Sequence, residues 1–322
     1  MQVSVIIPTY NRAKDLDECL GSIITQTALP KEVIIVDDSD NDEIENLIIG
    51  RKNQFNEDNI LLRYIKNERE RSLAIARNIG IENATEDIIL FLDDDVILDE
   101  EYLKELLMIY KEYPNALGVQ GYVTNNNFSR LKNSIKKILF YGHNESNKCR
   151  VLPSTNTTYP YPLTKIITCQ WLSGSNHSYK RSVLENFKFD ENLKRYSYKE
   201  DVDLSYLIYK QYPESLYITP HARLIHKVSQ EKRLPDKISI CMKRIYTFYF
   251  FYKNIDQNSK NKLIFFWSGI GHLVVNIGEL ILRRSGGKFL KLKYLIEAYI
   301  LCVKHIREIK EGDLEFFNKR LR

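Results

Sequence analysis

Residues 88–95, IILFLDDD, place three carboxylates directly after five apolar side chains. The apolar run predicts a buried strand, and acids at the end of such a strand are costly unless a positive group neutralises them. Mg²⁺ and Mn²⁺ prefer oxygen ligands and commonly bridge one or two carboxylates to the phosphates of a substrate. The stretch therefore indicates a divalent-metal site. An exposed turn that caps the following helix is the alternative.

Strands and helices alternate on either side of this stretch. Between the first two β-rich runs, Leu16, Leu20, Ile23 and Ile24 recur on one face of a helix. The expected strands cover residues 3–7, 33–36, 60–65, 88–92 and 117–123. This alternation predicts an α/β fold with a mostly parallel sheet flanked by helices, and ligands bound at the carboxyl ends of its strands.

Polar residues follow three of these strands, namely 8–12 (PTYNR), 37–40 (DDSD) and 93–95 (DDD). Parallel strands bring such ends to one edge of the sheet. Acids there can hold a metal or accept hydrogen bonds from a nucleobase, and Arg12 can bind a phosphate. The edge therefore predicts a nucleoside-diphosphate site. The chain has no GxGxxG after its first strand and no Walker lysine loop, which argues against a dinucleotide fold and a P-loop NTPase.

Three segments, 3–12 (VSVIIPTYNR), 33–40 (VIIVDDSD) and 73–96 (LAIARNIGIENATEDIILFLDDDV), together resemble the nucleotide-sugar half of a family 2 glycosyltransferase of GT-A, Rossmann-like fold. The resemblance implies a nucleotide-sugar donor, most commonly a UDP-sugar, bound with Mn²⁺ or Mg²⁺. It implies that Asp93 and Asp95 form the DxD pair, with Asp95 as the main metal ligand, and that Asp38 pairs with the base. The other donor-side positions that it implies are Pro8, Thr9, Tyr10, Arg12, Arg71, Asn78 and Asp94. For Arg77, in the same stretch, a structural ion pair is the alternative.

Two later motifs resemble the acceptor side of the same family: 171–176 (WLSGSN), and 198–204 (YKEDVDL), the ED motif at the start of a helix. The resemblance implies that Asp201 is the general base of an inverting transfer and that Glu200 assists it or binds the acceptor. Acids at a helix N-terminus can also simply cap the helix. His226 lies about where some members place a histidine in the metal shell, and a hydrogen-bonded histidine is the alternative.

The C-terminal part of the chain is basic, with 20 Lys and Arg against 9 Asp and Glu in residues 227–322, whereas residues 1–226 carry 27 against 33. Residues 263–282 are long enough to cross a bilayer. Their polar exceptions, however, fall on one helical stripe: His272, Asn276 and Glu279, followed by Arg283. We expect attachment to an anionic membrane surface, with a buried or dimerising subdomain and a membrane span as alternatives. Because the aromatic residues lie in apolar helical segments, nucleic acid is not expected as a partner.

Three regions are predicted: a nucleotide-sugar half at 1–124, an acceptor and catalytic half at 125–235, and a basic, aromatic helical extension at 236–322. The expected activity moves a sugar from a nucleotide to a hydroxyl of a glycan or lipid-linked acceptor. A sugar nucleotidyltransferase and a catalytically silent scaffold subunit are the alternatives. The sequence shows no secretory leader and no paired cysteine spacing. We therefore expect five packing cysteines and a cytoplasmic protein, peripheral at the inner face of the cell membrane.

Overall fold

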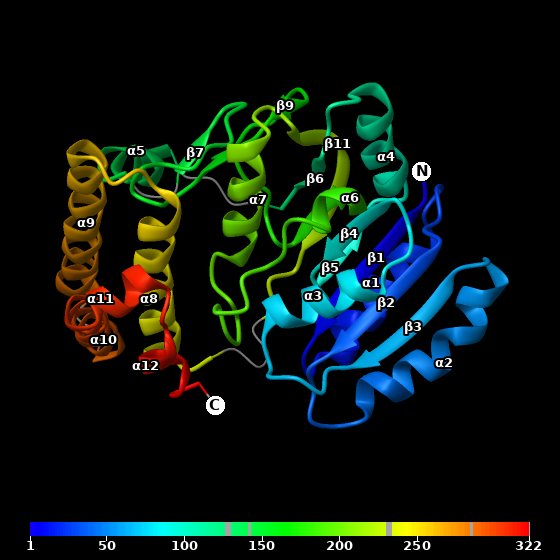
Figure 1. Cartoon of the computed structure of the whole chain (residues 1–322), viewed down its shortest axis with the longest axis horizontal. Helices are drawn as coiled ribbons and strands as arrows, with labels where there is room; N and C mark the ends of the chain where they lie inside the picture. Colours follow the sequence, from blue (N-terminus) through cyan, green and yellow to red (C-terminus); the bar gives the residue numbers. More distant parts are fainter. Residues whose placement is uncertain (126–129, 141–142, 230–233, 284–285, 322) are drawn as a thin grey trace. The chain divides into compact units, whose positions relative to one another are not determined.

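The computed structural model describes residues 1–125, 130–140, 143–229, 234–283 and 286–321 (Figure 1). Contacts divide the chain into two compact units, which are described separately. The first comprises Met1–Asn127, Pro162–Glu191 and Glu200–Lys232, and the second comprises Phe128–Tyr161, Asn192–Lys199 and Arg233–Arg322.

The first unit is built on one mixed sheet. In spatial order its strands are β3 (Leu61–Lys66), β2 (Glu32–Asp37), β1 (Val3–Thr9), β4 (Ile88–Leu92), β10 (Asn176–Lys180), β6 (Gly118–Val123), β11 (Leu216–His226) and β5 (Val96–Leu98), while β9 (Ile167–Thr168) also pairs with β11. Strands β10, β5 and β9 run against the others, so the sheet is mostly parallel. The predicted strand at 88–92 coincides with β4, and the other four predicted strands each overlap an observed one.

The helices of this unit lie between its strands in the chain. They are α1 (Ala13–Ile24), α2 (Glu43–Glu57), α3 (Leu73–Asn83), α4 (Tyr102–Glu112), α6 (Arg181–Leu184) and α7 (Glu200–Gln211). Helix α1 buries Leu16, Leu20 and Ile23, as its spacing predicts. Strands β1, β2 and β4 are buried along their whole lengths. Apolar strands under apolar helix faces therefore form the core, and the polar residues that follow the strands lie at its edge.

The second unit is mainly helical, with α5 (Arg130–Ile138), β7 (His143–Glu145), β8 (Thr158–Pro160), α8 (Asp236–Asn254), α9 (Ser259–Arg283), α10 (Gly286–Lys304), α11 (Ile306–Glu311) and α12 (Glu315–Asn318). Helix α8 supplies much of its core, where the rings of Phe251 and Phe265 stack with centroids 4.0 Å apart. None of the helices in the described ranges combines the length and apolar content needed to cross a membrane. All five cysteines of the chain are buried and free, which confirms their prediction as packing residues.

Candidate active site

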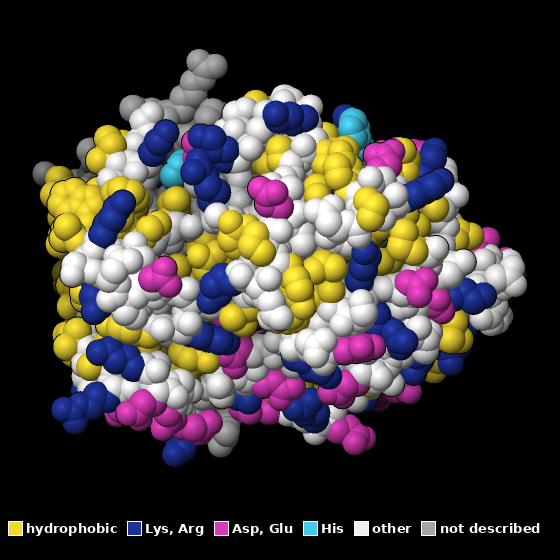
Figure 2. All heavy atoms as spheres, turned by 45° about the horizontal axis from the view of Figure 1, so that its top comes forward, with side chains coloured by type: hydrophobic (Ala, Val, Ile, Leu, Met, Phe, Trp, Pro, Cys, Tyr) yellow, Lys and Arg dark blue, Asp and Glu magenta, His cyan; other side chains and the backbone are white. Residues whose placement is uncertain are grey.

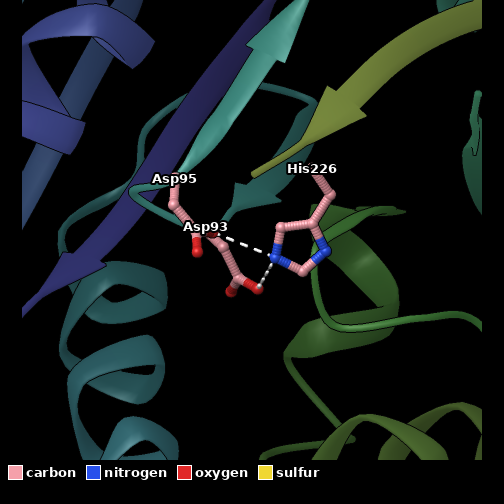
Figure 3. A group of neighbouring side chains, drawn as sticks. All are labelled: Asp93, Asp95 and His226. Carbon is pink, nitrogen blue, oxygen red and sulfur yellow. Dashed lines mark ion pairs between the residues drawn. The ribbon is translucent and has the colours of Figure 1, made fainter. Parts of the chain in front are cut away.

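Two carboxylates and an imidazole converge at the carboxyl end of β4 (Figure 3). Asp93, Asp95 and His226 each offer a ligand atom, and these atoms lie within 4.8 Å of one another. Nε2 of His226 is 3.0 Å from Oδ1 of Asp95 and 3.8 Å from Oδ2 of Asp93. The Asp95 side chain is only 5% exposed, whereas Asp93 and His226 are 30% and 24% exposed. The cluster therefore opens to solvent on the side of Asp93 and His226.

Strand pairing brings His226 to the two acids across a long sequence separation. Strand β5, directly after the acids, pairs antiparallel with the end of β11, so that Val96 lies opposite His226. The backbone just beyond β11 then holds Asp95, because the amide of Ser229 donates to its Oδ2 at 2.7 Å. The sheet thus brings His226, for which the resemblance implies a place in the metal shell, beside the two acids.

The donor set of this cluster suits a hard divalent cation. Carboxylate oxygens are the ligands that Mn²⁺ and Mg²⁺ prefer, and imidazole is a common additional ligand for transition metals. Oδ1 of Asp95 is buried, and none of the described residues donates a hydrogen bond of good geometry to it. The His226 imidazole nevertheless lies close to this oxygen. Burial opposes a charge on His226, yet the contact with Asp95 and the charge of Asp93 raise its pKa. The two carboxylates therefore favour a positive charge on the imidazole beside them.

Asp94 is not part of this cluster and contacts the end of β1. Its Oδ2 accepts a hydrogen bond from Oγ1 of Thr9 at 2.9 Å, and its Oδ1 pairs with Nη1 of Arg12 at 3.1 Å. Arg12 also comes within 3.9 Å of Asp95. Burial raises the pKa of Asp94 to about 7, although Arg12 opposes this rise. Asp94 thus places the Arg12 guanidinium beside the cluster. Pro8, just before Thr9, is buried within β1.

The ends of β1 and β2 meet, because Thr9 lies opposite Asp37 in the parallel register. Asp38 follows β2 and is half-buried, with its Oδ1 accepting a hydrogen bond from the Asn67 side chain at 2.6 Å. Burial raises the pKa of Asp38 to about 6.

The guanidinium of Arg71 lies 4.2 Å from the centroid of the Tyr10 ring. One of its nitrogens also contacts both oxygens of Asp40, at 2.7 and 2.9 Å. Tyr10 and Arg71 therefore form a stacked pair, and the geometry is that of a cation–π contact.

A fully buried arginine links the cluster to the acceptor-side motifs. Arg77 donates to Oδ1 of Asp93 at 3.2 Å and to the carbonyl of Gly174 at 2.8 Å, and it forms an ion pair with Glu200. Burial raises the pKa of Glu200 to about 8, and the neighbouring carboxylate of Asp201 adds to this rise while Arg77 opposes it. Of the two interpretations of Arg77, the structure therefore shows the ion pair.

Close packing of α3 on the sheet keeps Arg77 at this depth. A Cβ added at Gly80, one turn further along α3, would lie 2.4 Å from Cγ2 of Ile6 on β1. Real side chains do not tolerate such a distance, so a larger residue would push the helix away from the sheet. Gly80 therefore helps to set the distance between α3 and the strand ends.

Two backbone amides orient the Asp201 carboxylate at the start of α7. The amide of Gly174 donates to Oδ2 at 2.8 Å, and the amide of Val202 donates to Oδ1, also at 2.8 Å. Gly174 belongs to the first acceptor-side motif and Asp201 to the second. The two motifs are thus in direct contact, and Asp201 remains partly exposed.

Comparison with protein families agrees with this geometry. A family model described as glycosyl transferase family 2 matches residues 4–187, more than half of the chain. The chain belongs to glycosyl transferase family 2. This confirms the predicted family and the enzyme class, which is that of a glycosyltransferase.

Among curated relatives of this glycosyltransferase is the glucosyl-dolichyl phosphate glucuronosyltransferase of Haloferax volcanii. It is 26% identical over 238 residues, which cover 71% of this chain and 70% of the relative. The poly(ribitol-phosphate) β-N-acetylglucosaminyltransferase TarP of Staphylococcus aureus is 32% identical, over only 37% of this chain and 38% of its own length. The chain thus spans most of the first relative and less than two fifths of the second.

Among solved structures, that of S. aureus TarS 1–349 in complex with UDP-GlcNAc superposes with a TM-score of 0.59 at 18% identity, covering 92% of this chain and 79% of that one. The mannosyltransferase PcManGT of Pyrobaculum calidifontis, in complex with GDP-Man and Mn²⁺, gives 0.57 at 16% identity, covering 93% and 86%. At such identities the likeness concerns the fold, and it confirms the predicted GT-A architecture of the glycosyltransferase.

One predicted donor-side residue of the glycosyltransferase is engaged elsewhere. Asn78 is 2% exposed, and its amide group donates to the carbonyl of Phe189 and to Oε1 of Glu191, both at 3.0 Å. Its Oδ1 accepts the Phe189 amide at 3.1 Å. Asn78 therefore anchors the segment after α6, and the structure does not bring it into the carboxylate cluster.

The structure also reveals a polar residue that the sequence interpretation passed over. Gln120 on β6 is 1% exposed, its Oε1 accepts the amide of Ser173 at 2.6 Å, and its Nε2 has no partner within the described part of the chain. A glutamine between small and apolar residues in the stretch GVQGYV was the available signal. Gln120 holds the loop at 171–176 against the sheet.

Proposed function

We propose that this glycosyltransferase is an inverting, divalent-metal-dependent enzyme that transfers a sugar from a UDP-sugar to a hydroxyl of a lipid-linked glycan. One observation carries the proposal: within a single unit, Arg77 joins the cluster of Asp93, Asp95 and His226 to the acids at the start of α7. A leaving diphosphate needs positive charge, and an incoming hydroxyl needs a base. The cluster would meet the first requirement by holding a cation, and the acids at the start of α7 would meet the second.

On the donor side, Asp95, Asp93 and His226 would hold Mn²⁺ or Mg²⁺. When bound, such a cation offsets the charge that develops on the leaving diphosphate. Arg12, placed by Asp94, adds a second positive charge beside the cluster. The Asp38 carboxylate is available to accept a hydrogen bond from the base. The Tyr10–Arg71 pair borders the nucleotide, and Asn78 acts indirectly by anchoring its segment.

On the acceptor side, Asp201 takes the proton from the attacking hydroxyl. Its carboxylate is oriented by two amides and partly exposed, which suits a base that must meet a substrate. Glu200 is buried against Arg77, so it serves as a positioning residue for the start of α7 and not as a second base. Arg77 positions both sides, because Asp93 and Glu200 share its guanidinium.

The names of similar proteins support the choice of substrates. The TarS structure contains UDP-GlcNAc, and the archaeal relative is named for a glucosyl-dolichyl phosphate acceptor. The PcManGT complex holds GDP-Man, which makes guanine the second candidate base. For the chain as a whole we propose a donor half at 1–124, an acceptor half at 125–235, an extension at 236–322 and a location at the inner face of the cell membrane. Self-association through the C-terminal helices is the alternative role of that extension.

The proposal is tested by incubating the full chain with a panel of nucleotide sugars and Mn²⁺ and measuring free nucleoside diphosphate. We expect hydrolysis of a UDP-sugar that needs the cation and is abolished by Asp95→Ala. The exposed Asp99, four residues further on, gives the matched control Asp99→Ala, which should retain activity. Release of pyrophosphate would instead establish a sugar nucleotidyltransferase. A complete lack of turnover with every donor would favour a silent scaffold.

A further inference from the structure

Helix α9 carries its apolar side chains on the outside. Six of them recur every three or four residues and are between 44% and 71% exposed: Leu263, Phe266, Ile270, Val274, Ile277 and Ile281. This spacing puts them on one stripe of the helix. The arrangement is the reverse of a surface helix in a water-soluble domain, where the apolar stripe faces the core.

The polar side of α9 faces the helical unit. Ser268 is 5% exposed and hydrogen-bonds the Asn156 amide at 3.2 Å, while His272 and Asn276 are half-buried. Burial lowers the pKa of His272 to about 3, and the charge of Arg244 on α8 adds to this effect. The polar stripe that the sequence shows therefore faces the interior of the helical unit. Because this unit packs against the polar stripe, the apolar stripe of α9 points outward.

Neighbouring helices extend the exposed stripe into a face. On α10, Phe289, Ile296 and Ile300 are 62%, 46% and 60% exposed. Helix α5 adds Ile138, whose carbonyl accepts a hydrogen bond from the Trp267 indole of α9 at 3.3 Å. We call these exposed apolar residues of α5, α9 and α10 the apolar face. Figure 2 shows hydrophobic side chains gathered along the left edge, the side on which Figure 1 draws α9 and α10.

Lysines border the apolar face. The exposed ones are Lys136 and Lys137 on α5, Lys260 and Lys262 on α9, and Lys293 and Lys304 on α10. The sequence of α5 contains no acid, and that of α9 contains one, Glu279, which belongs to the polar stripe and not to the apolar one. A large exposed apolar surface marks an interaction site, and a lysine border selects an anionic partner.

We propose that the apolar face docks onto an anionic lipid bilayer, with α9 lying in the plane of the interface. Apolar side chains that point outward along one helix, with lysines beside them, suit insertion just beneath anionic headgroups. A second copy of the chain fits less well, because pairing the same face would bring lysines against lysines. The stripe from Leu263 to Ile281 is roughly 27 Å long at the rise of an α-helix, which is ample length for contact with a membrane surface.

The test is co-sedimentation of the full chain with two kinds of vesicle, phosphatidylcholine alone and an equal mixture of phosphatidylcholine and phosphatidylglycerol. We expect binding to the mixed vesicles that falls as salt is raised, since surface charges are screened. The double variant Phe266→Asp, Ile270→Asp should weaken this binding roughly tenfold or more, because charges replace buried apolar area. The double variant Lys136→Glu, Lys137→Glu should weaken binding to the mixed vesicles. Changing the salt concentration should restore little of that binding.

Matched controls come from the first unit. Ile49 on α2 is 59% exposed and Lys111 on α4 is also exposed, so Ile49→Asp and Lys111→Glu make the same kinds of change elsewhere and should leave vesicle binding unaltered. A chain that ignores both vesicles would overturn the proposal. So would a dimer in lipid-free solution that Ile270→Asp dissociates, since that result would assign the face to a second copy. Donor hydrolysis in detergent-free buffer should survive in every variant, so failure of the membrane proposal is distinguishable from failure of the proposed function.

Discussion

Helices α3 and α9 both depart from the usual distribution of polar and apolar side chains, but in opposite directions. Helix α3 buries a charged and a polar residue, Arg77 and Asn78, against the sheet. Helix α9 exposes its apolar stripe and turns its polar residues inward. A buried charge and an exposed apolar surface are each unfavourable without a partner.

The two departures differ in where their partners are. Arg77 finds its partners within the chain, in Asp93, Glu200 and the carbonyl of Gly174. The stripe of α9 remains exposed in the part of the chain that the structure describes. The first departure therefore explains how the site is assembled, and the second points to a surface outside the protein.

The largest expected effect concerns the acceptor end of the Arg77 network. Asp201→Asn keeps the shape of the side chain but removes the proposed base, so the rate of sugar transfer should fall by roughly two to four orders of magnitude. Donor affinity, measured by calorimetry with Mn²⁺, should stay close to that of the wild type. Unchanged transfer would remove Asp201 from the chemistry and leave the network with a purely structural role.

The second effect concerns stability. It tests whether the buried charge of Arg77 is neutralised by the acids that it contacts. Arg77→Met leaves two acids without their buried partner and should lower the free energy of unfolding by about 3–5 kcal/mol. Glu200→Gln in the same chain should recover part of this loss, because one of the two buried acids that Arg77 contacted is gone. Urea unfolding of the wild type, both single variants and the double variant measures this coupling. Strictly additive losses would contradict a direct Arg77–Glu200 interaction.

Those two regions also differ in how far the sequence predicted them. The strand ends that carry Arg12, Asp38 and the acids were predicted, because apolar runs and the polar residues after them are adjacent in the chain. The pairing of Arg77 with Glu200 was not, because 123 residues separate them and only the folded sheet brings them together. Resemblance located Asn78 in the donor region, whereas its amide anchors the segment after α6.

Short strands were missed for a related physical reason. Strand β5 has only three residues, and it forms because β11 is there to pair with it. Nothing in three residues distinguishes such a strand from a turn. On α9 the sequence did reveal a polar stripe, which divides the helix into a polar and an apolar face. The sequence pattern does not show which of these two faces is covered by the rest of the protein.

A smaller effect is expected for the pH dependence of donor binding at the β2 end. In the proposed contact with the base, an ionised Asp38 accepts a hydrogen bond more strongly than the protonated acid does. Burial raises the pKa of Asp38 to about 6. The Michaelis constant for the donor should therefore be constant above that pH and rise by up to about tenfold for each pH unit below it. Asp38→Asn does not titrate, so its Michaelis constant should not show the rise that is due to protonation of Asp38. Any rise caused by the effect of acid on metal binding should remain. An identical pH profile in the two proteins would exclude Asp38 as the contact to the base.

The smallest expected effect is that of a substitution in the α9 stripe, and the same substitution in α3 compares the two helices directly. Ile75 on α3 is 2% exposed and Ile270 on α9 is 54% exposed, so the same substitution, isoleucine to glutamine, probes a buried and an outward position. Ile75→Gln should destabilise the fold by about 2–5 kcal/mol, since it buries an amide and loses packing. Ile270→Gln should change the unfolding free energy by no more than about 0.5 kcal/mol, because that side chain is already in water. Equal losses in urea unfolding would mean that the α9 stripe is covered in the folded protein, and the contrast between the two helices would then disappear.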